Sequence, residues 1–236
     1  MKSIKIMSCI LAAGMLFTSC NMSNTGKGAL IGGGSGAAVG AGLGAIFGKG
    51  KGAAIGAAVG AAVGTTAGAL IGKKMDKAAE QAKQVEGAQV EQVTDNNGLQ
   101  AVKVTFDSGI LFSTSSSNLS SSAKSSLSKF ANDVLNQNRD MDVTIYGYTD
   151  NQGWKNSTAE QSYQKNLNLS QERAQSVASY LLACGVSTNQ IKSVQGMGEA
   201  NPIADNSTAA GRQENRVEIY LYASQQMIQQ AEAGTL

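Results

Sequence analysis

Apolar residues occupy every second position in three segments of the second half of the chain, at residues 102–106, 141–145 and 217–221. This period of two is typical of β-strands with one buried face. A short apolar segment at residues 191–197 predicts a further strand. The second half of the chain is therefore expected to contain a four-stranded sheet.

Two helices are predicted between these strands. Apolar residues keep helical spacing over residues 123–134 and again over residues 174–184, where Gly185 ends the second helix. The resulting order is strand, helix, strand, helix, strand, strand (βαβαββ). It predicts the α+β class: a two-layer sandwich over residues 99–223, with the helices on one face of the sheet.

Glycine recurs at every fourth position in the first half of the chain, and most intervening residues are Ala, Val, Ile or Leu. Repeated G-x-x-x-G lets helices pack closely in lipid, whereas in water each interior glycine costs a helix about 1 kcal/mol relative to alanine. A flexible Gly/Ala linker is the alternative interpretation. The glycines expected to pack between helices are Gly28, Gly32, Gly36, Gly40, Gly44, Gly56, Gly60, Gly64, Gly68 and Gly72.

Lys49 and Lys51 interrupt this apolar segment, which predicts a turn between helices at about 28–47 and 53–72. Twenty residues at 1.5 Å each span about 30 Å, the thickness of the hydrocarbon core of a bilayer. The segment resembles the glycine-zipper regions of bacterial outer-membrane lipoproteins. We therefore expect a helical hairpin over residues 28–72 that inserts into outer-membrane lipid or self-associates into a homo-oligomer.

Residues 1–19 have the pattern of a secretory signal: lysines first, then an apolar run at residues 6–17 that is too short to span a bilayer. The run ends in Phe17-Thr-Ser-Cys20, which resembles the bacterial lipobox, with Phe17 where Leu is usual. The resemblance implies cleavage before Cys20, lipid on Cys20 and a lipidated linker at residues 20–27. An ordinary cleaved signal is the alternative.

Polar residues dominate two other segments. Residues 73–98 are rich in the helix formers Ala, Gln, Glu and Lys, so Lys73–Gln92 predicts a surface helix or stalk, which a turn at Asp95–Gly98 ends. The tail at residues 224–236 is polar with a few apolar residues, and its sequence suggests no role.

Composition narrows the functions open to this chain. A net charge of +2 argues against nucleic acid as a partner, and the absence of histidine removes the commonest general base and zinc ligand. Three scattered cysteines form no metal-binding pattern, and Cys184 lies on an apolar helix face as a core thiol would. We expect no metal, no cofactor and no catalytic residue.

An enzyme is one alternative. Ser121-x-x-Lys124 and Ser126-x-x-Lys129 match the S-x-x-K motif of penicillin-interacting serine enzymes. The accompanying S-D-N and K-T-G motifs are absent, and such matches arise by chance in a serine-rich segment.

The domain at residues 99–223 resembles the OmpA-like peptidoglycan-binding domain. Four motifs carry the resemblance: Gly147-Tyr-Thr-Asp150, Asn166–Val177, Gly196–Glu199 and Gly211–Glu218. Two features depart from the family pattern. The loop between Gly153 and Asn166 is about eight residues longer than usual and contains the only tryptophan, Trp154. One basic residue, Arg216, precedes Val217 where the family often has two.

The resemblance implies a site for meso-diaminopimelate of the peptidoglycan stem peptide, whose side chain ends in an ammonium and a carboxylate on one carbon. It implies Asp150 as the ligand aspartate and Arg173 as the ligand arginine. Asn166 precedes Arg173 by seven residues, two helical turns, and so shares its face. Thr149 and Leu167 are expected to supply backbone contacts.

Together these features predict a non-enzymatic lipoprotein that ties the outer membrane to the cell wall, with its globular domain in the periplasm. Its partners would be peptidoglycan and membrane lipid. A membrane channel or envelope scaffold built from oligomerised zipper hairpins is the alternative function.

Overall fold

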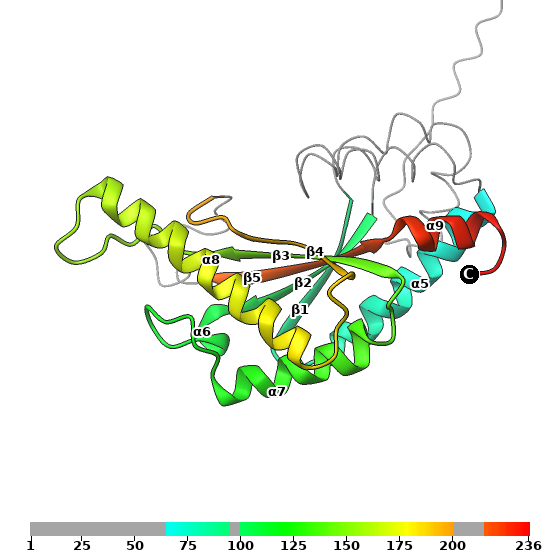
Figure 1. The fold of residues 1–236 in the computed structure, drawn as a ribbon, viewed down its shortest axis with the longest axis horizontal. Helices are drawn as coiled ribbons and strands as arrows, with labels where there is room; N and C mark the ends of the chain where they lie inside the picture. Colours follow the sequence, from blue (N-terminus) through cyan, green and yellow to red (C-terminus); the bar gives the residue numbers. More distant parts are fainter. Residues whose placement is uncertain (1–64, 95–99, 201–214) are drawn as a thin grey trace, which may run out of the picture.

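The computed structural model describes residues 65–94, 100–200 and 215–236. One five-stranded sheet is the centre of this part of the chain, with the strand order β1-β2-β5-β3-β4 (Figure 1). All neighbouring strands are antiparallel except β3 and β4, which are parallel. The strands are β1 (Ala88–Thr94), β2 (Gln100–Asp107), β3 (Met141–Tyr148), β4 (Ile191–Gly196) and β5 (Arg216–Ala223).

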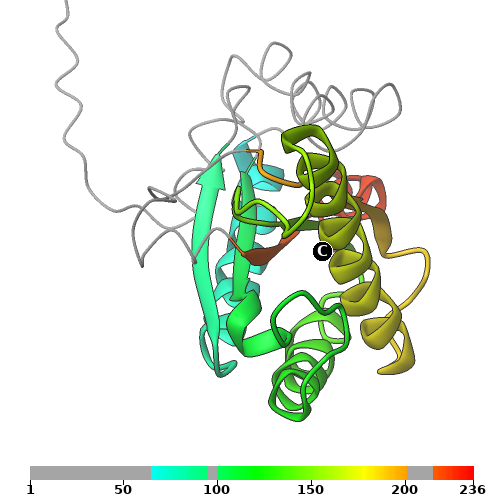
Figure 2. The ribbon, with the colours of Figure 1, turned by 90° about the vertical axis from the view of Figure 1, so that its left-hand side faces the viewer.

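Helices cover one face of this sheet, and their apolar residues form one core with those of the strands. Figures 1 and 2 both show α7 next to α8 on this side of the sheet. The helices are α5 (Thr65–Lys83), α6 (Ser108–Leu111), α7 (Ser121–Phe130), its π-helical continuation η1 (Ala131–Leu135), α8 (Ala159–Ala183) and α9 (Gln225–Glu232).

The predicted α+β sandwich is confirmed in class and order. The predicted order of strand, helix, strand, helix, strand, strand is present as β2, α7, β3, α8, β4 and β5. The alternation in β3 and β5 separates core residues such as Val143 and Ile219 from the residues of the opposite face. Gly185, which has a φ of 87°, follows α8 as the sequence predicted.

The predicted surface helix or stalk at Lys73–Gln92 is helical as far as Lys83, but its predicted extent and exposure are wrong. Helix α5 ends at Lys83, and β1 follows it and pairs with β2 along its whole length. Met75, Ala79 and Ala82 of α5 are fully or almost fully buried in the core. The alanines that suggested an exposed helix form the apolar face with which α5 packs onto the sheet, so this segment is part of the domain and not a stalk.

Helix α5 also includes the end of the predicted glycine zipper. Ala67 and Ile71 lie in the core of the domain, and Gly68 and Gly72 are buried with them. Residues 65–72 therefore pack on protein in this structure, which corrects the predicted extent of a lipid-inserted helix at residues 53–72. The rest of the hairpin, residues 28–64, and Cys20 lie outside the described residues. No helix of the described part of the chain is long and apolar enough to cross a membrane.

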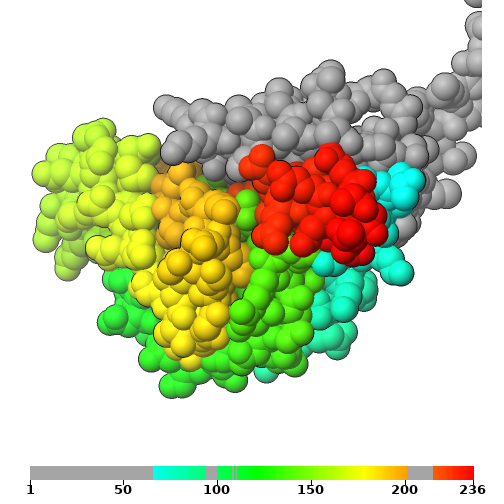
Figure 3. Space-filling view, turned by 45° about the vertical axis from the view of Figure 1, so that its right-hand side comes forward, coloured from blue at the N-terminus to red at the C-terminus, as the bar shows by residue number. Residues whose placement is uncertain are grey.

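The C-terminal tail, to which the sequence assigned no role, forms helix α9. Ser224 caps its first turn by accepting a hydrogen bond from Met227 N, and Met227 and Ile228 are buried. The space-filling view shows α9 seated beside α5 (Figure 3). Two helices from opposite ends of the described chain, α5 and α9, therefore pack against each other in the domain.

The backbone of α8 lies directly on β3 and β4, because both strands have glycine at the contact. A Cβ atom on Gly147 would lie 2.2 Å from the carbonyl oxygen of Ser170, and one on Gly196 would lie 2.3 Å from the backbone nitrogen of Gln171. Ser170 Oγ also accepts a hydrogen bond of 2.9 Å from Gly198 N, just beyond β4. These contacts fix the height of α8 above the strand ends.

Replacing Met75 tests whether α5 belongs to the core. We expect Met75→Ala to lower the free energy of unfolding by about 2–5 kcal/mol, because it leaves a cavity under α5. Lys77→Ala, a change at an exposed position of the same helix, should alter stability by less than about 0.5 kcal/mol. Urea unfolding followed by circular dichroism measures both, and equal small effects would contradict the observed packing.

Replacing Gly147 tests the close approach of α8. Gly147→Ala should destabilise the domain by about 1–3 kcal/mol, because the new methyl group overlaps backbone that cannot move aside. Gly153→Ala is the matched control, since a Cβ there has Ser162 Oγ as its nearest atom at 3.8 Å. The two free energies of unfolding should differ clearly; a Gly147 variant as stable as its control would refute the contact.

Candidate ligand-binding site

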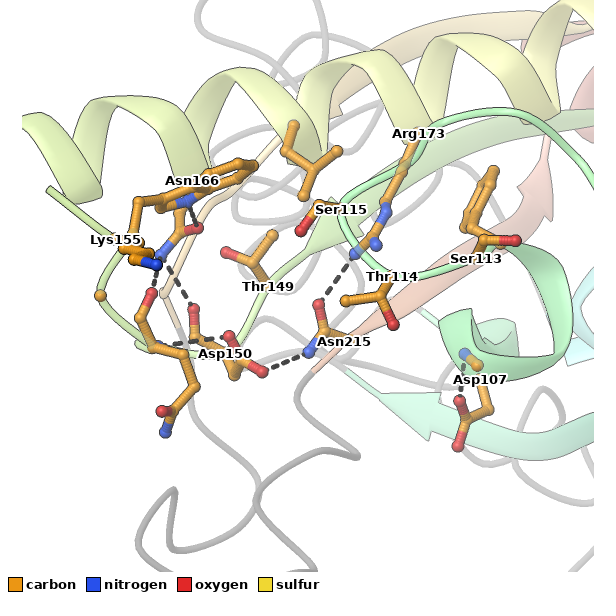
Figure 4. Close-up of a pocket in the computed structure, with 16 residues that line it drawn as sticks. Asp107, Ser113, Thr114, Ser115, Thr149, Asp150, Lys155, Asn166, Arg173 and Asn215 are labelled. Carbon is orange, nitrogen blue, oxygen red and sulfur yellow. Dashed lines mark hydrogen bonds between the residues drawn. The ribbon is translucent and has the colours of Figure 1, made fainter. Parts of the chain in front are cut away.

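A cavity of about 710 Å³ opens at the edge of the sheet where β3 ends and β5 begins. Because these two strands pair antiparallel in register to the end of β3, the residues after β3 lie beside those before β5. Asp150 comes from the first segment and Asn215 from the second. Asn166 and Arg173 reach the same cavity from α8 (Figure 4). Four polar groups from three segments therefore face one space.

Asn215 joins the two charged groups of the cavity. Arg173 Nη1 donates a 2.8 Å hydrogen bond to Asn215 Oδ1, and Asn215 Nδ2 donates a 2.6 Å hydrogen bond to Asp150 Oδ2 (Figure 4). The carboxylate and the guanidinium are thus held by one amide and make no direct ion pair with each other. A ligand with one positive and one negative group could engage both.

Arg173 is a fixed cation with little access to water. Its side chain is 4% exposed, its Nε donates to the carbonyl oxygen of Ser116 at 3.0 Å, and its guanidinium lies 5.3 Å from the ring centroid of Phe112. Burial lowers the pKa of Arg173 from its ordinary value, and the negative charge of Asp150 opposes this shift. Arginine stays protonated in proteins, so the site holds a permanent positive charge.

Asn166 positions the loop that contains Asp150. Its Nδ2 donates to the carbonyl oxygens of Asp150 at 3.3 Å and Gln152 at 3.2 Å and to Glu199 Oε1 at 2.9 Å. Its Oδ1 accepts a 2.6 Å hydrogen bond from Trp154 Nε1. Asn166 is 3% exposed, so it acts as a buried link between α8 and the loop more than as an open ligand group.

The two neighbours expected to supply backbone contacts differ in position. Thr149 lines the cavity, and its Oγ1 is buried without a hydrogen-bond partner among the described residues. Leu167 does not line the cavity; it packs against Gly198, while Leu169 lines the cavity instead. One residue along a helix turns the side chain by about 100°, which takes Leu167 off the face that Asn166 shares with Arg173.

The sequence patterns missed several residues of the cavity. Asn215 lies inside the Gly211–Glu218 motif, but nothing in its spacing showed that it would bridge two charges. Trp154 and Lys155 line the cavity from the long loop.

Arg216 and Glu218 form a buried ion pair of 2.7 Å and do not line the cavity. In the described residues, no group of three or more His, Cys, Asp or Glu side chains could hold a metal ion.

Comparison with known proteins agrees with this fold. Residues 111–216 match the model of the OmpA family, and residues 1–76 match that of the YMGG-like Gly-zipper. The C-terminal part of this chain is therefore an OmpA family domain, and it follows a Gly-zipper segment.

Two relatives and one solved structure illustrate the likeness. The chain is 43% identical to the probable lipoprotein YiaD of Escherichia coli over 119 residues, 50% of this chain and 47% of YiaD. It is 46% identical to the peptidoglycan-binding protein ArfA of Mycobacterium tuberculosis over 84 residues, 36% of this chain and 23% of ArfA. It thus spans less than half the length of either relative. The cell wall anchor of the T6SS from Pseudomonas aeruginosa superposes with a TM-score of 0.50 at 26% identity, over 64% of this chain and 97% of that one.

The single tryptophan makes the role of Asn166 measurable. Asn166→Ala should shift the fluorescence emission of Trp154 to longer wavelength, because the indole loses its buried partner. It should also cost about 1–3 kcal/mol of stability, since backbone carbonyls are left unpaired. Asn151→Ala, at an exposed position of the same loop, should change neither quantity. An unchanged emission spectrum in the Asn166 variant would contradict the described link.

Proposed function

We propose that this chain is a non-enzymatic lipoprotein that ties the outer membrane to the cell wall. The observation that carries the proposal is the cavity of an OmpA family domain in which a buried arginine and an aspartate face one space. The peptidoglycan-binding relative ArfA and the fold of a cell wall anchor support peptidoglycan as the partner. The relative YiaD supports lipid attachment at Cys20.

The ligand within peptidoglycan is meso-diaminopimelate of the stem peptide. Its side chain ends in an ammonium and a carboxylate on one carbon, a zwitterion that matches the charges of Asp150 and Arg173. The ammonium group binds the carboxylate of Asp150, and the ligand carboxylate binds the guanidinium of Arg173. Asn215 holds both protein groups in place before the ligand arrives, so little side-chain freedom is lost on binding.

Thr149 is suited to complete this site. A buried hydroxyl without a partner costs free energy, because it has given up its hydrogen bonds to water. The Thr149 hydroxyl at the wall of the cavity has no such partner among residues 65–94, 100–200 and 215–236. It donates a hydrogen bond to the ligand carboxylate beside Arg173, which turns an unfavourable group of the free protein into a contact with the ligand.

The segment before the domain provides the tether. Lipid on Cys20 anchors the chain, and the described domain begins at α5, so residues 20–64 lie between the two. Two acyl groups on one residue give stable membrane attachment where one alone does not. A single open site binds one stem peptide modestly, and many lipoproteins that face one sacculus give firm attachment through multivalency.

Co-sedimentation with isolated diaminopimelate-type sacculi tests the proposal. The mature chain, residues 20–236 in detergent, should pellet with sacculi, and free diaminopimelate should release it. Asp150→Ala and Arg173→Ala should each lower affinity by about 30-fold or more, since removing one partner of a buried charged contact costs about 2–5 kcal/mol. Arg173→Lys should also bind weakly, because lysine keeps the charge and loses the two parallel donors.

Two variants outside the cavity serve as controls. Lys129→Ala and Asp133→Ala break an exposed ion pair between α7 and η1 and should pellet like the wild-type chain. Circular dichroism confirms that every variant is folded. Failure of the wild-type chain to pellet would refute cell-wall binding, and pelleting that free diaminopimelate does not reverse would refute the assignment of the ligand.

A further inference from the structure

Trp154 is held rigidly at the rim of the cavity by the start of α8. Its backbone nitrogen donates to Ser162 Oγ at 3.0 Å, and its indole Nε1 donates to Asn166 Oδ1 at 2.6 Å. Its carbonyl oxygen accepts a hydrogen bond of 3.1 Å from Ser157 N. Both residues of α8 are almost fully buried. The long loop therefore presents one aromatic ring in a fixed position.

This ring does little for the core of the domain. Trp154 is half-buried, and it belongs to neither of the two hydrophobic clusters found among the described residues. It instead lines the cavity, where its indole is bonded to Asn166. A large ring that is fixed in place and open to a cavity is a typical binding surface for an apolar part of a ligand.

Two lysines lie near Trp154, one beside its ring and one next to it in the chain. Lys165 Nζ is 5.7 Å from the ring centroid of Trp154 and donates a 2.8 Å hydrogen bond to Ser157 Oγ. Lys155 is exposed and lines the cavity next to Trp154 (Figure 4). The rim beside Asp150 thus combines an apolar platform with positive charge, which favours a ligand group that has a short hydrocarbon chain and a carboxylate.

The cavity also has room for more than one zwitterion. Its volume of about 710 Å³ falls within the range of sites that hold drug-sized ligands, whereas the Asp150–Arg173 pair engages only the end of one side chain. A ligand bound there continues along the cavity. On the side of Asp150, the cavity is lined by Trp154 and Lys155. We call these two residues, together with Lys165 beside the indole ring, the tryptophan rim.

We propose that the tryptophan rim is a second subsite, which binds the acidic residue next to diaminopimelate in the stem peptide. The methylene groups of that residue, a glutamate linked through its side chain, pack on the indole of Trp154. Its free carboxylate lies near the ammonium groups of Lys155 and Lys165. This inference rests on the proposed function, and it adds a preference for stems whose glutamate carboxylate is free over stems in which it is amidated.

Isothermal titration calorimetry on the mature chain in detergent tests the subsite with three ligands. These are free diaminopimelate, the stem tripeptide with a free glutamate carboxylate, and the same tripeptide with that carboxylate amidated. The wild-type chain should bind the free acid about fivefold more tightly than the amide, as expected for a partly exposed ion pair. Each variant is judged by the ratio of its affinities for the free-acid and the amidated tripeptide. A change in the Asp150–Arg173 site alters both affinities equally and leaves this ratio unchanged.

The variants separate the two parts of the rim. Lys155→Ala should reduce the ratio to about twofold or less. Trp154→Ala should weaken binding of both tripeptides relative to free diaminopimelate, and Trp154→Phe should retain most of that binding because it keeps a ring without the indole N–H. Lys129→Ala, on the distant α7, should behave like the wild-type chain.

The outcomes distinguish this inference from the function on which it rests. Absence of binding to all three ligands would refute the proposed function itself. If the chain binds diaminopimelate but binds the free-acid and amidated tripeptides equally tightly, the proposed subsite is overturned and the proposed function is not. A preference for the free acid that survives in both Lys155→Ala and Trp154→Ala would also overturn it, because the selectivity would then come from another part of the cavity.

Discussion

The backbone of α8 lies in direct contact with strands β3 and β4, and this contact positions the helix and the sheet that together hold the site. Gly147 and Gly196 place no side chain of their own between helix and sheet, so α8 lies closer to the strands than a larger residue would allow. Asp150 follows β3 by two residues, and Arg173 lies on α8. The contact of the two backbones therefore sets the positions from which the two charged side chains start, and the amide of Asn215 holds their ends.

This rigid frame explains how a buried arginine is tolerated. A guanidinium in a protein interior is stable only when its hydrogen bonds are made, and here a carbonyl oxygen, an amide oxygen and an aromatic ring surround it. The amide of Asn215 keeps Asp150 and Arg173 apart, so the two charges do not neutralise each other and both remain available. Asn166 fixes the loop in a similar way, because its side-chain amide donates a hydrogen bond to the carbonyl oxygen of Asp150 and so joins the loop to α8.

Much of the fold and the centre of the site follow from the sequence. The period of two in β2, β3 and β5 reflects a sheet with one face in the core, and Asp150 and Arg173 follow from motifs that this domain shares with its family. β1 was missed because its residues Ala, Gln and Glu favour helices, and only pairing with β2 makes it a strand. The role of Asn215 depends on the pairing of β3 with β5, which local patterns do not specify.

We infer that one zwitterion engages Asp150 and Arg173 in this cavity. A titration of the isotope-labelled mature chain with diaminopimelate, followed by NMR, tests it most directly. On ligand addition, the Nε–H signal of Arg173, the side-chain amide of Asn215 and the indole N–H of Trp154 should shift together and saturate at one ligand concentration. Shifts confined to other surfaces, such as α5 and α9, or no shifts at saturating ligand, would contradict it.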